Sequence, residues 1–187
     1  MDKAKQSKKT PVISKNIRIR YPHLFHVGKF SIIDDFCYFS SEVRIGFCSH
    51  IASGCSVAGG PKELFQLGDY CSLSSGVKIW CASDDFVNDL ITIIPFNVKT
   101  EIKENFIRGG VTIHDYCAVG ANAVVMPNNR IPEGVSIGAL SFVPVNFEFK
   151  PWSVYAGNPL RLIKQRNRLT VLKEVDKLRE ALNMSNN

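Results

Sequence analysis

The chain contains 187 residues, of which 45% are hydrophobic and 21% are charged, and this composition excludes a wholly disordered protein. Its net charge of +6 comes from the two ends, because residues 1–20 carry +6, residues 161–180 carry +4, and residues 21–160 carry −4. Basic ends around a mildly acidic middle, without a zinc-finger, helix-turn-helix or RNA-recognition signature, predict no nucleic-acid partner.

Residues 1–26 are predicted to form a basic tail and a lead-in segment. The first ten residues, MDKAKQSKKT, lack the apolar region of a signal peptide, and no apolar run approaches the roughly 20 residues of a membrane span. The six cysteines form no CxxC pair, so we expect free thiols in a reducing compartment. The sequence therefore predicts a cytoplasmic protein without an integral membrane segment.

From Val27 onward, large apolar residues recur at every sixth position in three phased blocks. The fifteen positions are Val27, Ile33, Phe39, Ile45, Ile51, Val57, Leu67, Leu73, Ile79, Ile113, Val119, Val125, Ile131, Ile137 and Val143. The residue after each is often glycine or another small residue, and the residue four positions on is small at twelve of the fifteen. A period of six fits neither an amphipathic helix nor a long flat strand, and it indicates very short strands stacked in a solenoid.

This motif resembles the left-handed parallel β-helix family, in which three hexapeptides make one triangular coil. The resemblance implies an all-β solenoid of five coils, over 27–44, 45–66, 67–112, 113–130 and 131–148. The second coil is lengthened at Ala58–Pro61, and the third contains an excursion over about 85–110, which we expect to protrude as a loop. The predicted β-helix domain covers 27–150.

Four cysteines occupy the small inward position of their repeats, namely Cys37, Cys55, Cys71 and Cys117. This placement favours buried core thiols over metal or redox chemistry, so no metal site is expected.

Residues 151–187 are predicted to form a post-coil segment and a C-terminal helix. From about 168 to 183, Val171, Val175, Leu178 and Leu182 follow helical spacing without glycine or proline. We expect this helix to cap or pack against the open end of the solenoid.

Three segments are similar to hexapeptide acyltransferases of the xenobiotic, galactoside and sugar O-acetyltransferase group: Gly68–Ser74, Ile113–Pro127 and Tyr155–Lys164. The resemblance implies a homotrimer whose active sites lie between neighbouring solenoids. It also implies transfer of an acetyl group from acetyl-CoA to a hydroxyl or an amine of a sugar or nucleotide-sugar. Similar enzymes decorate the sugars of surface polysaccharides, which predicts a role in polysaccharide biosynthesis.

The similar enzymes place a histidine just before the excursion, where this chain has Asp84 and Asp85. His114 occupies a position at which the repeat prefers glycine. A count of faces places Asp84 and His114 at one corner in adjacent coils, so we expect the two side chains roughly 5 Å apart, as a catalytic pair. The alternative bases are Asp85 and, from a neighbouring subunit, His50.

The resemblance also implies a route for the cofactor. Pantetheine would follow backbone amides near Gly120, Ala121, Gly138 and Ala139, and the phosphates of CoA would lie near Asn158, Arg161 and Lys164.

Two other functions compete with acyl transfer on the same fold. A zinc-dependent carbonic anhydrase needs three converging histidine ligands, and the four histidines of this chain lack a suitable spacing. The other alternative is a non-catalytic assembly protein.

Overall fold

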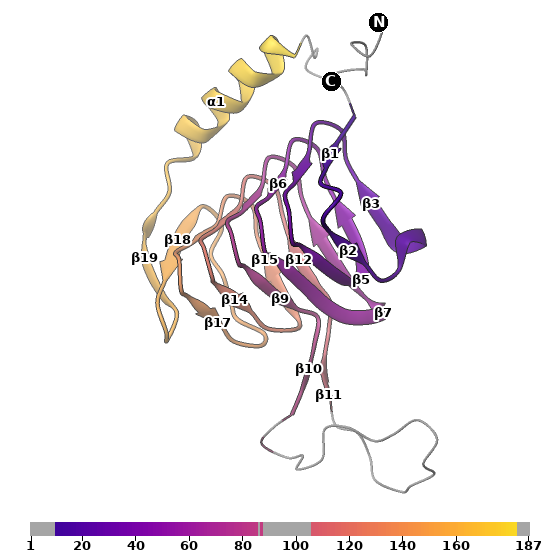
Figure 1. Ribbon diagram of the computed structural model, residues 1–187. Helices are drawn as coiled ribbons and strands as arrows, with labels where there is room; N and C mark the ends of the chain where they lie inside the picture. The colour runs from indigo at the N-terminus through magenta and orange to yellow at the C-terminus, as the bar shows by residue number, and fades with distance from the viewer. Residues whose placement is uncertain (1–9, 86, 88–105, 183–187) are drawn as a thin grey trace, which may run out of the picture.

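The computed structural model describes residues 10–85, 87 and 106–182, which form a parallel β-solenoid with three faces (Figure 1). The first face contains β1 (Val12–Ile13), β4 (Ile32–Ile33), β6 (His50–Ile51), β8 (Ser72–Leu73), β13 (Ala118–Val119), β16 (Ser136–Ile137) and β18 (Ser153–Ala156). The second face contains β2 (Arg18–Ile19), the first parts of β5 (Tyr38–Ile45) and β7 (Ser56–Leu67), and β9 (Lys78–Trp80), β14 (Val124–Val125) and β17 (Phe142–Val143). The third face contains β3 (Phe25–Val27), the last parts of β5 and β7, β12 (Val111–Ile113) and β15 (Asn129–Ile131).

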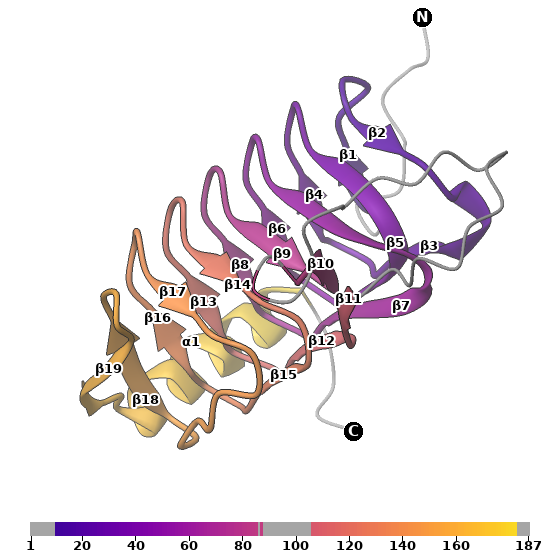
Figure 2. The ribbon, with the colours of Figure 1, turned by 90° about the horizontal axis from the view of Figure 1, so that it is seen from below.

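The hexapeptide positions form the interior of the solenoid, whose coils lie side by side in Figure 2. On the first face, Ile33 pairs with Ile51, Ile51 with Leu73, and Leu73 with Val119. These four side chains are at most 1% exposed. Each coil therefore buries the same apolar position against its neighbour, and hydrophobic burial holds the stack together. The predicted hexapeptide β-helix is confirmed.

The solenoid begins before Val27, which corrects the predicted five coils to about six. The additional coil pairs Ile13 with Ile33, Ile19 with Phe39, and Val27 with Ile45. The spacing of six holds from Ile13 to Ile19, but the 3-10 helix η1 (Pro22–Leu24) lengthens the path to Val27 by two residues. This insertion shifts the phase of the repeat, so a search at a strict spacing of six misses the first coil.

After β9 the chain leaves the solenoid. The strands β10 (Ala82–Asp84) and β11 (Phe106–Arg108) pair as an antiparallel hairpin that projects from the coils (Figure 1). The expected excursion is present as this stalk, and its tip lies outside the described residues. On its return the chain forms β12, where Val111 pairs with Phe65 on the third face. Counting in steps of six from Leu67 instead assigns residues 79–84 to the third face.

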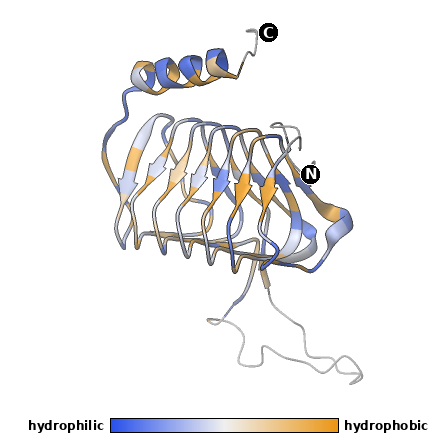
Figure 3. Ribbon diagram, turned by 45° about the horizontal axis from the view of Figure 1, so that its top comes forward, coloured by the Kyte–Doolittle hydropathy of each residue, from blue (hydrophilic) through white to orange (hydrophobic). Residues whose placement is uncertain are grey.

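The helix α1 (Arg168–Ala181) confirms the C-terminal helix predicted from the sequence. Asn167 caps its N-terminus, where the side-chain oxygen accepts a hydrogen bond of 3.1 Å from the N–H of Thr170. The helix follows β19 (Arg161–Gln165), which pairs antiparallel with β18, and it runs back beside the coils (Figures 1 and 3).

Aromatic rings stacked at one corner of the solenoid hold α1 in place. The ring centroids of Tyr70 and Tyr116 are 5.6 Å apart, and those of Tyr116 and Trp152 are 5.9 Å apart. Arg179 donates a hydrogen bond of 3.1 Å to the Tyr70 hydroxyl, and the guanidinium of Arg168 lies 5.6 Å from the Trp152 ring. The helix therefore packs along the side of the coils, and the expected position over their open end was wrong.

All six cysteines are free thiols. Those at the small inward positions are at most 3% exposed, which confirms them as core residues. Burial raises the pKa of the Cys81 thiol to about 11, so this thiol stays protonated near neutral pH. Within the described residues, no helix has the length and apolar character to cross a membrane.

Candidate active site

Small outward residues line the corner between the first and second faces, and we call this set the corner row. It contains Asp34, Ala52, Ser74, Gly120, Gly138 and Ala156. Their backbone N–H groups link the coils: Ser74 donates to the carbonyl of Val119 at 2.9 Å, and Gly120 donates to that of Ile137 at 2.8 Å. The row is therefore a continuous path along the solenoid, with a hydroxyl next to the first glycine.

The predicted pantetheine contacts lie on this corner. Gly120 and Gly138 use their N–H groups between coils, and a Cβ on Gly120 would lie 2.3 Å from the backbone nitrogen of Ala139. Glycine is therefore needed at these positions because adjacent coils approach too closely for a side chain. Ala121 and Ala139 donate their N–H groups to no acceptor within the described residues. Two free donors in adjacent coils suit the amide carbonyls of an extended ligand.

The predicted phosphate contacts lie at the C-terminal end of the same face. Arg161 stands opposite Ala156, and Lys164 stands opposite Val154, in the antiparallel pair of β18 and β19. Both cationic side chains are exposed, and Asn158 lies in the turn between the two strands. The structure thus brings all seven predicted cofactor residues to one end of the first face.

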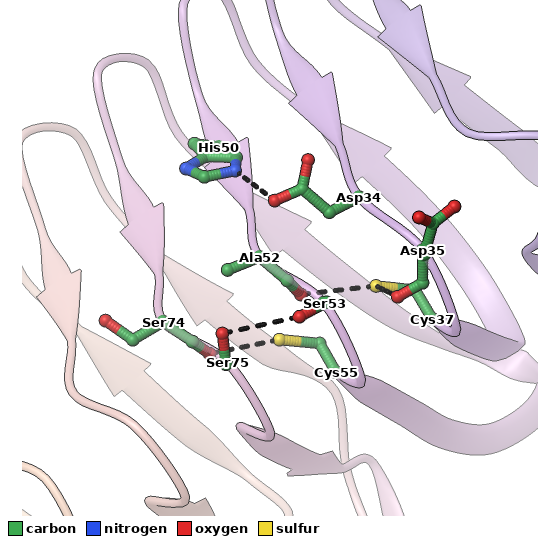
Figure 4. Close-up of polar contacts among 9 residues, drawn as sticks. All are labelled: Asp34, Asp35, Cys37, His50, Ala52, Ser53, Cys55, Ser74 and Ser75. Atoms are coloured by element: carbon green, nitrogen blue, oxygen red, sulfur yellow. Dashed lines mark hydrogen bonds and ion pairs between the residues drawn. The ribbon is translucent and has the colours of Figure 1, made fainter.

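His50 and Asp34 form an imidazole–carboxylate pair across adjacent first-face strands (Figure 4). The Nε2 atom of His50 lies 2.9 Å from Oδ2 of Asp34, and each side chain is 43% exposed. The strand partner of His50 in the next coil is Ser72, two residues before Ser74. His50 therefore stands beside the corner row, away from the stalk that carries Asp84.

The structure separates Asp84 from His114. Asp84 stands opposite Phe106 on the stalk, which leaves the solenoid where the second face ends. His114 follows β12 at the far end of the third face, and its N–H donates to the carbonyl of Ile131 at 2.9 Å. The expected catalytic pair does not form within one chain, because the excursion precedes the third face rather than following it.

Asp84 lines a cleft of about 290 Å³ at the base of the stalk, together with Gly59, Ala82, Phe106 and Arg108. Its neighbour Asp85 accepts a hydrogen bond of 3.1 Å from the N–H of Val87, as in a turn that opens a loop. Among the described residues, no group of three or more His, Cys, Asp or Glu side chains is arranged to hold a metal ion.

Sequence reasoning missed Ser74 and Arg108 as candidates. Ser74 carries a hydroxyl in a row where Ala52, Gly120 and Gly138 have none, and this contrast is visible in the sequence. Arg108 had no comparable signal, because its position depends on the pairing of β10 with β11.

The hexapeptide coils and the similarity to solved acyltransferases place the chain in the hexapeptide-repeat acyltransferase family. No family model matches the chain. A solved structure of AntD, an N-acyltransferase from Bacillus cereus, is 31% identical with a TM-score of 0.79, and the match covers 92% of each chain.

Two further relatives are acyltransferases by name. The dTDP-4-amino-4,6-dideoxy-D-glucose acyltransferase of Escherichia coli is 28% identical, over 83% of this chain and 82% of its own length. A probable macrolide acetyltransferase of Lysinibacillus sphaericus is 32% identical, over 54% of this chain and 59% of its own length.

The AntD structures contain dTDP-4-amino-4,6-dideoxyglucose or dTDP, together with coenzyme A or 3-hydroxybutyryl-CoA. They include variants of one serine and of one aspartate ten residues after it. In the present chain, only Ser74 with Asp84 and Ser75 with Asp85 have this spacing.

Proposed function

We propose that this protein transfers an acyl group from acyl-CoA to the amine of a nucleotide-linked sugar, with the β-helix as the acyltransferase domain. The proposal rests on what lies along the corner row. The exposed cations Arg161 and Lys164 lie at its C-terminal end, and the free N–H groups of Ala121 and Ala139 lie beside it. The Ser74 hydroxyl follows in the next coil. The sequence left both a hydroxyl and an amine open as the acceptor group, and the similarity to AntD supports the amine.

The cofactor follows the corner row from the C-terminal end of the solenoid. Arg161 and Lys164 neutralise the phosphates of CoA, and the N–H groups of Ala121 and Ala139 bind the amide carbonyls of pantetheine. The thioester then reaches the coil of Ser74, whose strand pairs with that of Gly120.

Ser74 and Asp84 carry the chemistry in this proposal. The acceptor amine attacks the thioester carbon, and the Ser74 hydroxyl donates a hydrogen bond to the developing oxyanion. The carbon–sulfur bond breaks as the amide forms, and Asp84 takes the proton released by the nitrogen and returns it to the CoA thiolate. The shared ten-residue spacing with the substituted serine and aspartate of AntD supports this pair.

A homotrimer supplies both residues to one site. Within one chain the whole second face separates Ser74 from Asp84. That face presents Trp80, Val124 and Phe142 outward, and a neighbouring copy would bury them. Packing through the second face sets the Ser74 corner of one subunit beside the stalk of the next.

We place the reaction in the cytoplasm, in the supply of modified sugars for surface polysaccharides. Six free thiols suit a reducing compartment, and nucleotide-linked sugars are activated precursors for polysaccharide assembly.

The test is an assay of thiol release from acetyl-CoA with dTDP-4-amino-4,6-dideoxyglucose as the acceptor, combined with mass spectrometry of the sugar. Thiol release that depends on the acceptor, together with an acylated sugar, is expected. If no nucleotide-linked amino sugar stimulates thiol release, the proposal is wrong.

A further inference from the structure

One face of the stalk concentrates side chains that can hold a ligand. Directly opposed residues of an antiparallel pair point to the same side, as do residues two apart on one strand. Asp84 opposes Phe106, and Ala82 opposes Arg108, so all four share that face. The small Ala82 leaves room between the carboxylate and the guanidinium, where the cleft of about 290 Å³ lies.

The Arg108 side chain is held in position but carries no paired charge. Its guanidinium lies 4.3 Å from the centroid of the Phe106 ring, which orients it along the wall of the cleft. Within the described part of the chain, Arg108 forms no ion pair with an acidic residue. A guanidinium oriented by an aromatic ring and free of a carboxylate is available for an anionic ligand.

A second cleft adjoins the first at Arg108 and Gly59 and has a volume of about 460 Å³. Gly60 lies on its wall with φ +92, and a Cβ built there would meet no heavy atom within 4 Å. The backbone is therefore open to close approach by a ligand. The exposed Lys62 adds a second cation, and Glu63 adds the carboxylate on this wall.

We propose that Arg108, assisted by Lys62, binds the diphosphate of the nucleotide-linked acceptor. This inference rests on the proposed function, because it takes Asp84 as the group that receives the proton of the amine. Asp84 and Arg108 are diagonal neighbours of the antiparallel pair, with Cα atoms about 7–8 Å apart, and both side chains point to the same side of it. A sugar with its amine at Asp84 thus presents its anomeric phosphate to Arg108.

The guanidinium has the geometry that this ligand requires. Its parallel N–H donors bind two phosphate oxygens at once, which an ammonium group cannot match. Arg108 therefore selects acceptors that carry a diphosphate over free sugars, and it sets the acceptor KM rather than the affinity for acyl-CoA, whose proposed site lies on the first face.

The direct test measures binding of dTDP and of thymidine to the full chain by titration calorimetry, without CoA. We expect Arg108→Ala to weaken dTDP binding about 10- to 100-fold and to leave thymidine binding unchanged. Arg108→Lys should weaken it less. The matched control is Arg130→Ala, which removes an exposed arginine from the third face and should bind dTDP as the unmodified chain does.

The inference would be overturned by no measurable dTDP binding to the unmodified chain, or by equal dTDP affinity with and without Arg108. An equal loss of thymidine binding would also overturn it, since Arg108 would then support the cleft rather than contact phosphate. If dTDP binding depends on Arg108 but no amino sugar is acylated, the diphosphate site stands and the proposed reaction fails.

Discussion

Ser74 and Asp84 of one chain lie at different corners of the solenoid, with the second-face strand β9 between them. Ser74 directly follows the first-face strand β8, whereas Asp84 stands on the stalk that leaves after the second face. If both residues serve one reaction, they come from different subunits. Whether the active site is shared between subunits can therefore be tested by mixing variants of the two residues.

Mixed trimers of two inactive variants should recover activity. We expect Ser74→Ala and Asp84→Asn each to lower kcat by about two orders of magnitude or more. Random assembly of equal amounts should regain about a quarter of the unmodified activity, because one chain supplies the serine and its neighbour the aspartate. A mixture of Asp84→Asn with Asp84→Ala is the control, and it should stay inactive. Failure of the first mixture to recover would contradict a site shared in this way.

Asp84 and His114 should differ sharply in their effect on the rate. Asp84→Asn keeps the size of the side chain but removes the proton acceptor, so kcat should fall by about two to four orders of magnitude. His114→Ala should keep kcat within about threefold, because His114 lies at the far end of the third face. Steady-state kinetics with both substrates distinguishes them, and a comparable loss of kcat in both variants would restore the catalytic pair.

The His50–Asp34 pair should matter little to folding or to the rate. Both side chains are 43% exposed, and exposed ion pairs contribute about 0–1 kcal/mol. We expect His50→Ala to leave the melting temperature nearly unchanged and kcat within a few-fold of the unmodified protein. A loss as large as that of Asp84→Asn would identify His50 of a neighbouring subunit as the base.

The double variant Arg161→Ala/Lys164→Ala should raise the KM for acetyl-CoA by about tenfold or more, because two cations on β19 face the phosphates in the proposed path. Acetyl-pantetheine, which lacks the nucleotide end of CoA, provides the matched control. The KM for acetyl-pantetheine should be the same for the double variant and for the unmodified protein. A KM for acetyl-CoA that does not change would place the cofactor elsewhere.

The stacked apolar residues inside the solenoid, which we call the interior ladder, should determine its stability. Leu73 is fully buried between Ile51 and Val119, so Leu73→Ala should lower the free energy of unfolding by about 2–5 kcal/mol. Thr112→Ala, on the outside of the third face, should change it by no more than about 0.5 kcal/mol. Chemical denaturation at equal protein concentration measures both, and similar losses would argue against the interior ladder as the source of stability.

The sequence by itself determined the repeating part of the molecule. A period of six places Ile51, Leu73 and Val119 in one buried ladder, since stacked coils must present the same apolar position to one another. The same period places Gly120 and Gly138 at one corner and the four small cysteines inside the coils. It missed the first coil only where η1 interrupts the period between Ile19 and Val27.

Only the tertiary structure decided where the residues outside the repeat lie. Asp84 and His114 were expected to lie together because the period of six was continued through 79–84. The chain instead leaves the coil there and returns at β12. The repeat predicts the position of a residue only where each coil packs directly on the preceding coil. In the stalk, cross-strand pairing sets the positions, and it brings Arg108 beside Asp84 although 24 residues separate them in the sequence.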